Sequence, residues 1–165
     1  MPLKLQIAAP ADAVVIAALR NAVAANLTER FGKGHWSGCC TERGVLWDMK
    51  TGRVYVARQR SKIIATLRLA KKKPWAIDVK YFSPCKQPLY LTAIAVASDL
   101  QGEGIGRLCI EEAKRLAKEF PADAIRLDAY DAEAGAGEFY RKCGFREVAR
   151  VKYRGTPLIY FEMML

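Results

Sequence analysis

The sequence has few of the residues that build metal sites and disulfide frameworks. It contains a single histidine and five cysteines, and the cysteines form no Cys-x-x-Cys pair. Their number is odd, and Cys39 and Cys40 are adjacent. A structural zinc site needs four ligands at close spacing, and a disulfide framework needs cysteines that can pair. We therefore predict reduced thiols and no bound metal.

Long hydrophobic runs are also missing. A membrane-spanning helix needs about 20 predominantly apolar residues, but the apolar stretch at 13–18 is soon followed by Arg20 and Asn21. The opening residues, MPLKLQIAAPAD, lack the charged and then apolar layout of a signal peptide. We therefore expect a cytoplasmic protein that does not interact with membranes. No repeat, linker or low-complexity tract divides the chain, so we predict a single domain over residues 1–165.

The charge is strongly positive but dispersed. Lys and Arg number 27 against 17 Asp and Glu, which gives a formal net charge of +10. Lys71–Lys73 is the only run of three basic residues, and aromatic residues do not alternate with the basic ones as platforms for stacked bases. The charge is compatible with a phosphate-rich ligand, and its dispersion argues against a nucleic-acid-binding protein.

Periodicity predicts an alternation of helices and strands. In the first helix Val15, Leu19, Val23 and Leu27 recur at an interval of four residues. Residues 31–44 hold four glycines and are predicted to form a mobile loop or a broken helix, and residues 71–88 an irregular segment with a short strand near 77–81. The predicted elements are a helix at 11–30, strands at 53–58, 62–69 and 89–96, a helix at 104–119, a strand at 124–130, a helix at 133–142 and strands at 145–153 and 158–165.

The order of these elements predicts a mixed α/β fold. A strand, a helix and a second strand span residues 89–130, which implies one parallel pair with a right-handed crossover. The hairpins at 53–69 and 145–165 imply antiparallel strands around that pair. The helix at 104–119 is amphipathic, and its predicted apolar face consists of Ile105, Leu108, Cys109, Ala113, Leu116 and Phe120.

Three glycines at every second position, Gly102, Gly104 and Gly106, join the strand at 89–96 to the helix that follows. The first turn of a helix exposes unpaired N–H groups and a partial positive charge, and glycines let a ligand come close. Such a loop typically binds phosphate or pyrophosphate. Arg107 can add a charged donor there.

Two familiar phosphate-binding motifs do not fit this loop. A P-loop ends in Gly-Lys-Ser/Thr, whereas this loop ends in Gly106-Arg107-Leu108. A dinucleotide fingerprint, Gly-x-Gly-x-x-Gly, would place glycine where Arg107 stands, and it needs a tighter turn after the strand than the one after Val96. We therefore exclude both.

A third pattern fits. Gln101, Gly104 and Gly106 form Gln-x-x-Gly-x-Gly after a strand, and the segment AVASDLQGEGIGRLCIEEAKRLAKE closely resembles the acetyl-CoA-binding motif of the GNAT superfamily of N-acetyltransferases. Further on, GEFYRKCGF resembles the second signature of that family, an aromatic-Tyr pair followed by Gly-Phe. The order of the predicted elements matches the family from about residue 5 to the C-terminus.

The resemblance implies a mostly antiparallel central sheet with one splayed parallel pair, 89–96 and 124–130, and helices on both faces. It further implies that acetyl-CoA enters the gap between these two strands as cosubstrate. The backbone of the first strand would then pair with the pantetheine arm, and the glycine loop would hold the pyrophosphate. The residues predicted to bind acetyl-CoA are Ile94, Ala95, Val96, Gln101, Gly102, Glu103, Gly104, Ile105, Gly106, Arg107, Glu133 and Ala136.

Tyr140 matches the tyrosine that serves as general acid in many members of the family. Attack of an amine on a thioester expels a thiolate, and a phenol with a pKa of about 10 can give that thiolate a proton. The other interpretation is a tyrosine packed in a helix. A backbone N–H of Ile94 or its neighbour would meet the oxyanion.

Two departures from the family pattern leave questions open. Glu133 stands where the family often has an asparagine that contacts the cofactor arm. Tyr90 and Thr92 lie where some members carry a glutamate as general base, and neither is a ready base. The amine would lose its proton through water or through another side chain, with Asp78, Glu29, Glu42 and His35 as the open candidates.

The resemblance implies an acetyl-CoA-dependent N-acetyltransferase that acts on a primary amine of a small molecule by direct attack in a ternary complex. Its acceptor site would be built from residues 30–47 and 73–86, whose aromatic side chains either shape a pocket or simply pack. The alternative is a non-catalytic module that binds or senses acyl-CoA. The protein would be a monomer or a homodimer, and the final strand, LIYFEMML, would be either an exposed edge that pairs between subunits or an internal strand.

Overall fold

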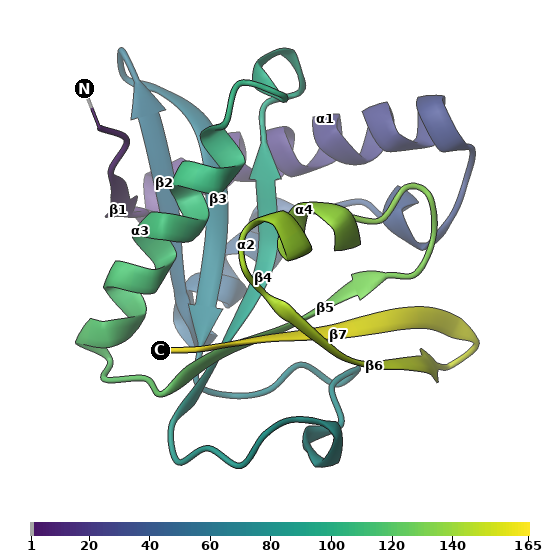
Figure 1. Ribbon diagram of the computed structural model, residues 1–165. Coiled ribbons are helices and arrows are strands. Elements are labelled where there is room, and N and C mark those ends of the chain that lie inside the picture. The colour runs from purple at the N-terminus through teal and green to yellow at the C-terminus, as the bar shows by residue number, and fades with distance from the viewer. Residues whose placement is uncertain (1) are drawn as a thin grey trace.

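A computed structural model describes residues 2–165 as one seven-stranded sheet in the order β1-β2-β3-β4-β5-β7-β6, with helices on both faces (Figure 1). Neighbouring strands are antiparallel except for the parallel pair β4 and β5. This confirms the predicted fold class. The strands are β1 Leu5–Ile7, β2 Arg53–Gln59, β3 Lys62–Ala70, β4 Pro88–Val96, β5 Ala124–Tyr130, β6 Arg146–Tyr153 and β7 Thr156–Met164.

Two pairs of helices cover the sheet. Helices α3 (Ile105–Glu119) and α4 (Gly137–Lys142) lie on one face, and α1 (Ala13–Phe31) and α2 (Glu42–Thr51) lie on the other (Figure 1). Because side chains alternate along a strand, each strand contributes residues to the packing on both faces of the sheet. In β2, for example, Tyr55 and Ala57 belong to the core beneath α3, whereas Val54 and Val56 pack against buried residues of α1 and α2.

The parallel pair separates part of the way along its length. β4 and β5 are paired from Pro88 opposite Ala124 only as far as Tyr90 opposite Arg126. Beyond that point β4 stays paired with β3, and β5 stays paired with β7. One side of β4 is therefore left without a strand partner, as the resemblance predicted.

A bulge in β4 lies just past this separation. Ala93 has a left-handed backbone with φ of 52°, which is uncommon for a residue other than glycine. Opposite it, the register with β3 shifts between Thr66 and Arg68. A bulge bends a strand and increases its twist, so it turns the end of β4 away from β5.

Two elements were not predicted. β1 has only three residues, too short for a periodic pattern to show. α2 begins at Glu42, inside the segment predicted as a loop or broken helix, and the Thr41 hydroxyl caps it by accepting the Gly44 N–H at 3.0 Å. A threonine at this position is a typical helix start, so the signal was present in the sequence.

Two predicted elements are corrected. The strand expected near 77–81 is wrong, because the backbone forms a 3₁₀ turn at Val79–Tyr81 that the Asp78 carboxylate caps. The helix expected from residue 133 begins only at Gly137, since residues 131–136 form a turn in which Gly135 donates to the Ala132 carbonyl at 2.9 Å.

The helix faces also differ in part from the prediction. On α3, Cys109, Ala113 and Leu116 are buried as predicted, but Leu108 is 46% exposed. Ile110 and Ala117 are buried in its place, because the face centred on Ala113 is the one that meets the sheet. On α1, Val15 is exposed, although the four-residue interval placed it with Leu19.

The C-terminal strand is internal. β7 lies between β5 and β6, so the possibility that it forms an exposed edge is wrong. The two edges of the sheet are the short strand β1 and the strand β6, which carries Arg146, Glu147, Arg150 and Lys152 and has a register irregularity between Glu147 and Ala149.

The 22-residue helical segment Pro10–Phe31 is long and apolar enough to suit a membrane-spanning helix. The core helix of a globular protein can be equally long and apolar. In this fold Ala13, Ile16 and Ala17 are buried with Val54 and Val56 of β2. The segment therefore packs against the sheet.

A buried carboxylate ties β7 to the segment before β4. Glu162 is 1% exposed, accepts the Ser83 hydroxyl at 2.5 Å and the Ser83 N–H at 3.1 Å, and is ion-paired with Arg146. Burial alone would raise the pKa of Glu162, but the bonds from Ser83 and Arg146 hold it below its ordinary value of 4.5. Folding therefore favours the charged form.

Replacing Glu162 with glutamine is expected to lower the free energy of unfolding at pH 7 by about 1–3 kcal/mol. The glutamine amide presents N–H groups to partners that are themselves donors, so at least one bond is lost. The contribution of Glu162 is present above pH 4.5 and is lost as the pH falls through the lowered pKa of the folded state. Denaturant unfolding at pH 7 and pH 3 measures this. The exposed Glu119→Gln is the control, and equal stability of the two variants at pH 7 would contradict the expectation.

Candidate active site

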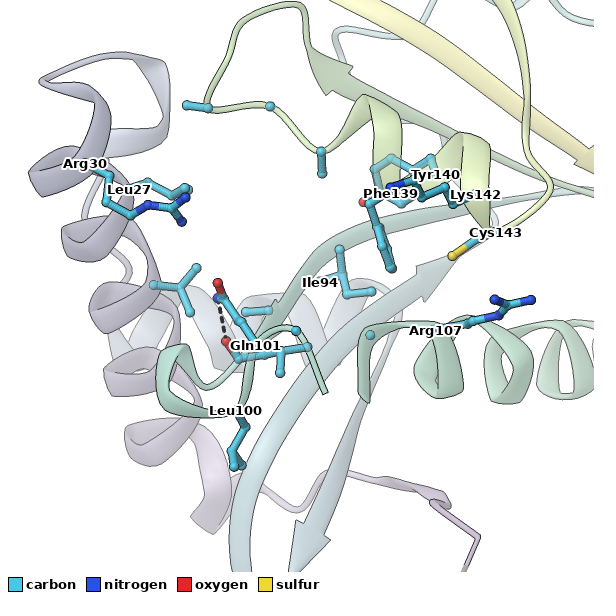
Figure 2. A pocket seen from close by; sticks show the side chains of 18 of the residues that line it. Leu27, Arg30, Ile94, Leu100, Gln101, Arg107, Phe139, Tyr140, Lys142 and Cys143 are labelled. Atoms are coloured by element: carbon cyan, nitrogen blue, oxygen red, sulfur yellow. Dashed lines mark hydrogen bonds between the residues drawn. The ribbon is translucent and has the colours of Figure 1, made fainter. Parts of the chain in front are cut away.

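A cavity of about 710 Å³ opens where β4 and β5 have separated. Its walls come from the end of α1, the last residues of β4, the glycine loop, the turn at 133–136 and one side of α4. Figure 2 shows Leu27 and Arg30 of α1 on one side and Phe139 and Tyr140 of α4 on the other, with Ile94 between them. Segments far apart in the sequence therefore meet at one hollow.

The structure brings nearly all of the predicted site residues to this cavity. Two do not line it: Glu103 is exposed, and Ile105 packs against the core. Their roles toward acetyl-CoA stay predictions. The predicted residues that line it are Ile94, Ala95, Val96, Gln101, Gly102, Gly104, Gly106, Arg107, Glu133, Ala136 and Tyr140.

The glycine loop presents a row of free N–H groups. Gly102 and Gly104 both have φ of 84°, a left-handed conformation that other residues adopt only with strain. The first backbone bond of α3 is donated by Leu108 to the Gly104 carbonyl at 3.1 Å. Within residues 2–165, the N–H groups of residues 102–107 donate to no other group of the protein. They therefore form the unpaired, partly positive start of a 15-residue helix at the rim of the cavity.

Gly106 keeps the passage between the loop and α4 open. A Cβ atom at this position would lie 3.1 Å from the Phe139 ring and 3.8 Å from the Val96 side chain. Both neighbours line the cavity. Any larger side chain at residue 106 would therefore displace Phe139 or fill the passage.

The free side of β4 is partly closed by a side chain. The Gln101 amide donates to the Val96 carbonyl at 3.0 Å, the bond drawn as a dashed line in Figure 2. Gln101 is exposed, so this bond is easily exchanged for another donor. A ligand that runs along β4 can donate a hydrogen bond to the Val96 carbonyl in place of Gln101.

Tyr140 has the properties of a proton donor. Its ring is buried among Phe139, Phe145 and Phe161, while the residue also lines the cavity. Burial raises the pKa of Tyr140 above its ordinary value of 10, and the charge of Asp128 raises it further. The phenol therefore keeps its proton at neutral pH.

The two segments predicted to form the acceptor site both lie against β5. In the first, the His35 carbonyl accepts the Tyr130 hydroxyl at 3.0 Å, and Trp36 packs edge-on against the same tyrosine. In the second, the Ser83 carbonyl accepts the Arg126 guanidinium at 2.8 Å. Trp75, by contrast, is 84% exposed.

Several cavity residues were not identified from the sequence. The four-residue interval of Val23 and Leu27 indicated only a helix, and both residues line the cavity. Arg30 and Phe31, which lie in the predicted acceptor segment 30–47, line it as well. Apolar side chains look the same in a sequence whether they face a core or a ligand. Among residues 2–165, no three His, Cys, Asp or Glu side chains are grouped as a metal site would need.

Comparisons with known proteins assign the chain to a family. The sequence model of the Acetyltransferase (GNAT) family matches residues 18–145, so the chain belongs to the GNAT acetyltransferases. This supports an acyltransferase activity. None of the curated protein sequences matches this chain.

Solved structures of low sequence identity share the fold. A GNAT-family acetyltransferase from Listeria monocytogenes is 19% identical, with a TM-score of 0.75 over 99% of this chain and 95% of its own. An N-acetyltransferase from Staphylococcus aureus is 15% identical, with a TM-score of 0.73 over 99% of both chains. A GNAT-family acetyltransferase from Elizabethkingia anophelis, solved with acetyl-CoA bound, is 18% identical, with a TM-score of 0.62 over 99% of both chains.

Proposed function

We propose that this protein transfers an acetyl group from acetyl-CoA to a primary amine of a small molecule, by direct attack within a ternary complex. The observation that carries the proposal is the meeting of three features at one cavity. These are the free N–H groups of residues 102–107, the unpaired side of β4 and the protonated phenol of Tyr140.

The cavity residues suit the parts of acetyl-CoA. The N–H groups at the start of α3 would hold the pyrophosphate, and Arg107 would add a charged donor. The Val96 carbonyl and the N–H groups of β4 would pair with the amides of the pantetheine arm, with Gln101 giving up its bond to Val96. Glu133 and Ala136 also line the cavity, from the turn before α4. The small Ala136 leaves room for the arm.

Tyr140 would complete the reaction as general acid. Its hydroxyl has no hydrogen-bond partner within residues 2–165, so it is free to donate to a sulfur atom in the cavity. The raised pKa ensures that the proton is present at the pH of the reaction. A backbone N–H of β4 near Ile94 would stabilise the oxyanion.

Thermal melting with acetyl-CoA tests the cosubstrate. A ligand that binds only the folded state stabilises it by about 2.7 kcal/mol at 100 times its Kd, and we expect acetyl-CoA and CoA to raise the Tm. NADH and ATP share only the nucleotide part and are expected to raise it far less. No shift with either CoA compound would refute the assignment.

Release of free CoA thiol with a panel of amines then tests turnover. Thiol release that depends on an amine supports the transferase. Binding of acetyl-CoA without transfer to any amine would instead identify the protein as an acyl-CoA-binding or sensing module.

A further inference from the structure

Asp128 lies beside the gap between the parallel strands. It is two residues beyond Arg126, where the pairing of β5 with β4 ends. Leu127 and Ala129 belong to the core beneath α3 and α4. Because side chains alternate along a strand, Asp128 points to the opposite face, the one that α1 and α2 cover.

Its neighbours on that face touch both predicted acceptor segments. On one side of Asp128, Arg126 donates to the Ser83 carbonyl at 2.8 Å. On the other side, Tyr130 donates to the His35 carbonyl at 3.0 Å. Asp128 therefore stands between the two segments, at the place where an acceptor molecule would meet the gap from the face opposite α4.

The carboxylate of Asp128 is held without a partner. Within residues 2–165, no donor forms a hydrogen bond or ion pair with it. Burial raises its pKa above the ordinary 3.8, and no neighbouring cation opposes that effect. Asp128 is half-buried, so its carboxylate is partly removed from water without being paired. This is destabilising, and such groups are concentrated at functional sites.

The titratable groups that face Asp128 are tyrosines from three elements. They are Tyr130 on its own strand and Tyr160 on β7, with Tyr140 of α4 across the sheet, and burial together with the negative charge of Asp128 raises the pKa of each. Tyr140 packs on the other face of the sheet and lines the cavity. A base and an acid therefore approach the gap from opposite faces.

The other carboxylates and the histidine left open by the sequence are less suited. Asp78 caps a 3₁₀ turn and pairs with Lys80 at 3.4 Å, and its side chain is 50% exposed. Both ring nitrogens of His35 lie 3.2 Å from the Thr156 hydroxyl. Glu29 and Glu42 are exposed on their helices.

From this geometry we infer that Asp128 is the general base that accepts the proton of the acceptor amine. This inference rests on the proposed transferase function. The partner is an amine presented as an ammonium group, which the unpaired carboxylate attracts before it takes the proton.

The ammonium R–NH₃⁺ gives one proton to the Asp128 carboxylate, and the neutral amine forms a C–N bond with the thioester carbon. When the C–S bond breaks, Tyr140 gives its proton to the departing thiolate, and the second proton lost by the nitrogen restores Tyr140. Asp128 releases its proton to solvent, so each turnover yields an amide, free CoA thiol and one proton.

Asp128→Asn tests this role in the full-length protein, with acetyl-CoA and an amine that the wild type accepts. We expect the Tm shift produced by acetyl-CoA to be unchanged, because Asp128 is not part of the cavity wall. The kcat/KM for the amine is expected to fall about tenfold to a hundredfold at pH 7, since water replaces the base poorly. This loss is expected to shrink as the pH approaches the pKa of the amine, where no base is needed. Glu119→Gln, at the far end of α3, is the matched control.

The stability of Asp128→Asn separates a catalytic from a structural role. A carboxyl whose pKa is raised by folding destabilises the fold while it is charged, so the variant is expected to have a higher Tm than the wild type at pH 7. The difference is expected to vanish below pH 3.8, where the wild-type carboxyl is protonated in both states.

Unchanged transfer by Asp128→Asn at pH 7 would overturn the inference. So would a lower Tm at pH 7 or a loss of activity that alkaline pH does not reduce, because both belong to a structural residue. Loss of transfer in Asp78→Asn but not in Asp128→Asn would assign the base to Asp78. A wild type that binds acetyl-CoA but acetylates no amine would refute the transferase itself, and with it this role.

Discussion

Tyr140→Phe is expected to lower kcat by about 10²- to 10³-fold, or roughly 3–4 kcal/mol in the activation free energy. The variant removes one hydroxyl from a ring that Phe139, Phe145 and Phe161 hold in place, so the shape of the cavity is kept. The KM for acetyl-CoA and the Tm are therefore expected to change little. The steady-state rate of CoA thiol release gives kcat and the KM for acetyl-CoA, and thermal melting gives the Tm.

The control for Tyr140→Phe is Tyr153→Phe, at the hairpin end of β6 and away from the cavity. It is expected to retain wild-type kcat. Because burial raises the pKa of Tyr140, wild-type activity is expected not to decline between pH 7 and pH 10 through loss of the phenol proton. Full activity in Tyr140→Phe would return the residue to a packing role and leave the thiolate to take its proton from water.

Gly106→Leu is expected to weaken acetyl-CoA binding by roughly 100-fold, or about 2.7 kcal/mol. The backbone at residue 106 is that of an ordinary helix, so leucine is not excluded by conformation. Its side chain would have to enter the passage in which a Cβ atom already lies 3.1 Å from Phe139. Isothermal titration with acetyl-CoA gives the Kd.

Gly38→Leu makes the same change where nothing lies within 4 Å of a Cβ atom, and it leaves the cavity wall untouched. Its Kd for acetyl-CoA is expected to equal that of the wild type. Melting of the free Gly106→Leu variant shows whether it is folded. A folded Gly106→Leu protein with wild-type affinity would mean that acetyl-CoA does not pass between the glycine loop and α4.

The part of the site that could be predicted is the part encoded by local geometry. Gly102 and Gly104 adopt a left-handed backbone that favours glycine, and the amphipathic helix after them is long enough to show its period. Tyr140 was found because it lies in a short segment with a recognisable spacing. Each of these signals lies within a few residues of the chemistry that it indicates.

What could not be predicted depends on contacts between distant segments. Leu27 reaches the cavity only because α1 crosses the end of β4. In the sequence, Asp128 is simply one polar residue inside a predicted strand. Only the structure shows that its carboxylate has no hydrogen-bond or ion-pair partner within residues 2–165. β1 has no pattern of its own and exists because β2 offers it a free edge.

The two edges of the sheet bear on how this protein behaves when it is concentrated. β1 is too short to serve as a template, and β6 carries four charged residues and an irregular register. Charged, bulged or very short edge strands resist the addition of a strand from another chain and so suppress aggregation. A homodimer of this protein is accordingly expected to associate through its helices or loops, with the apolar β7 kept inside the sheet.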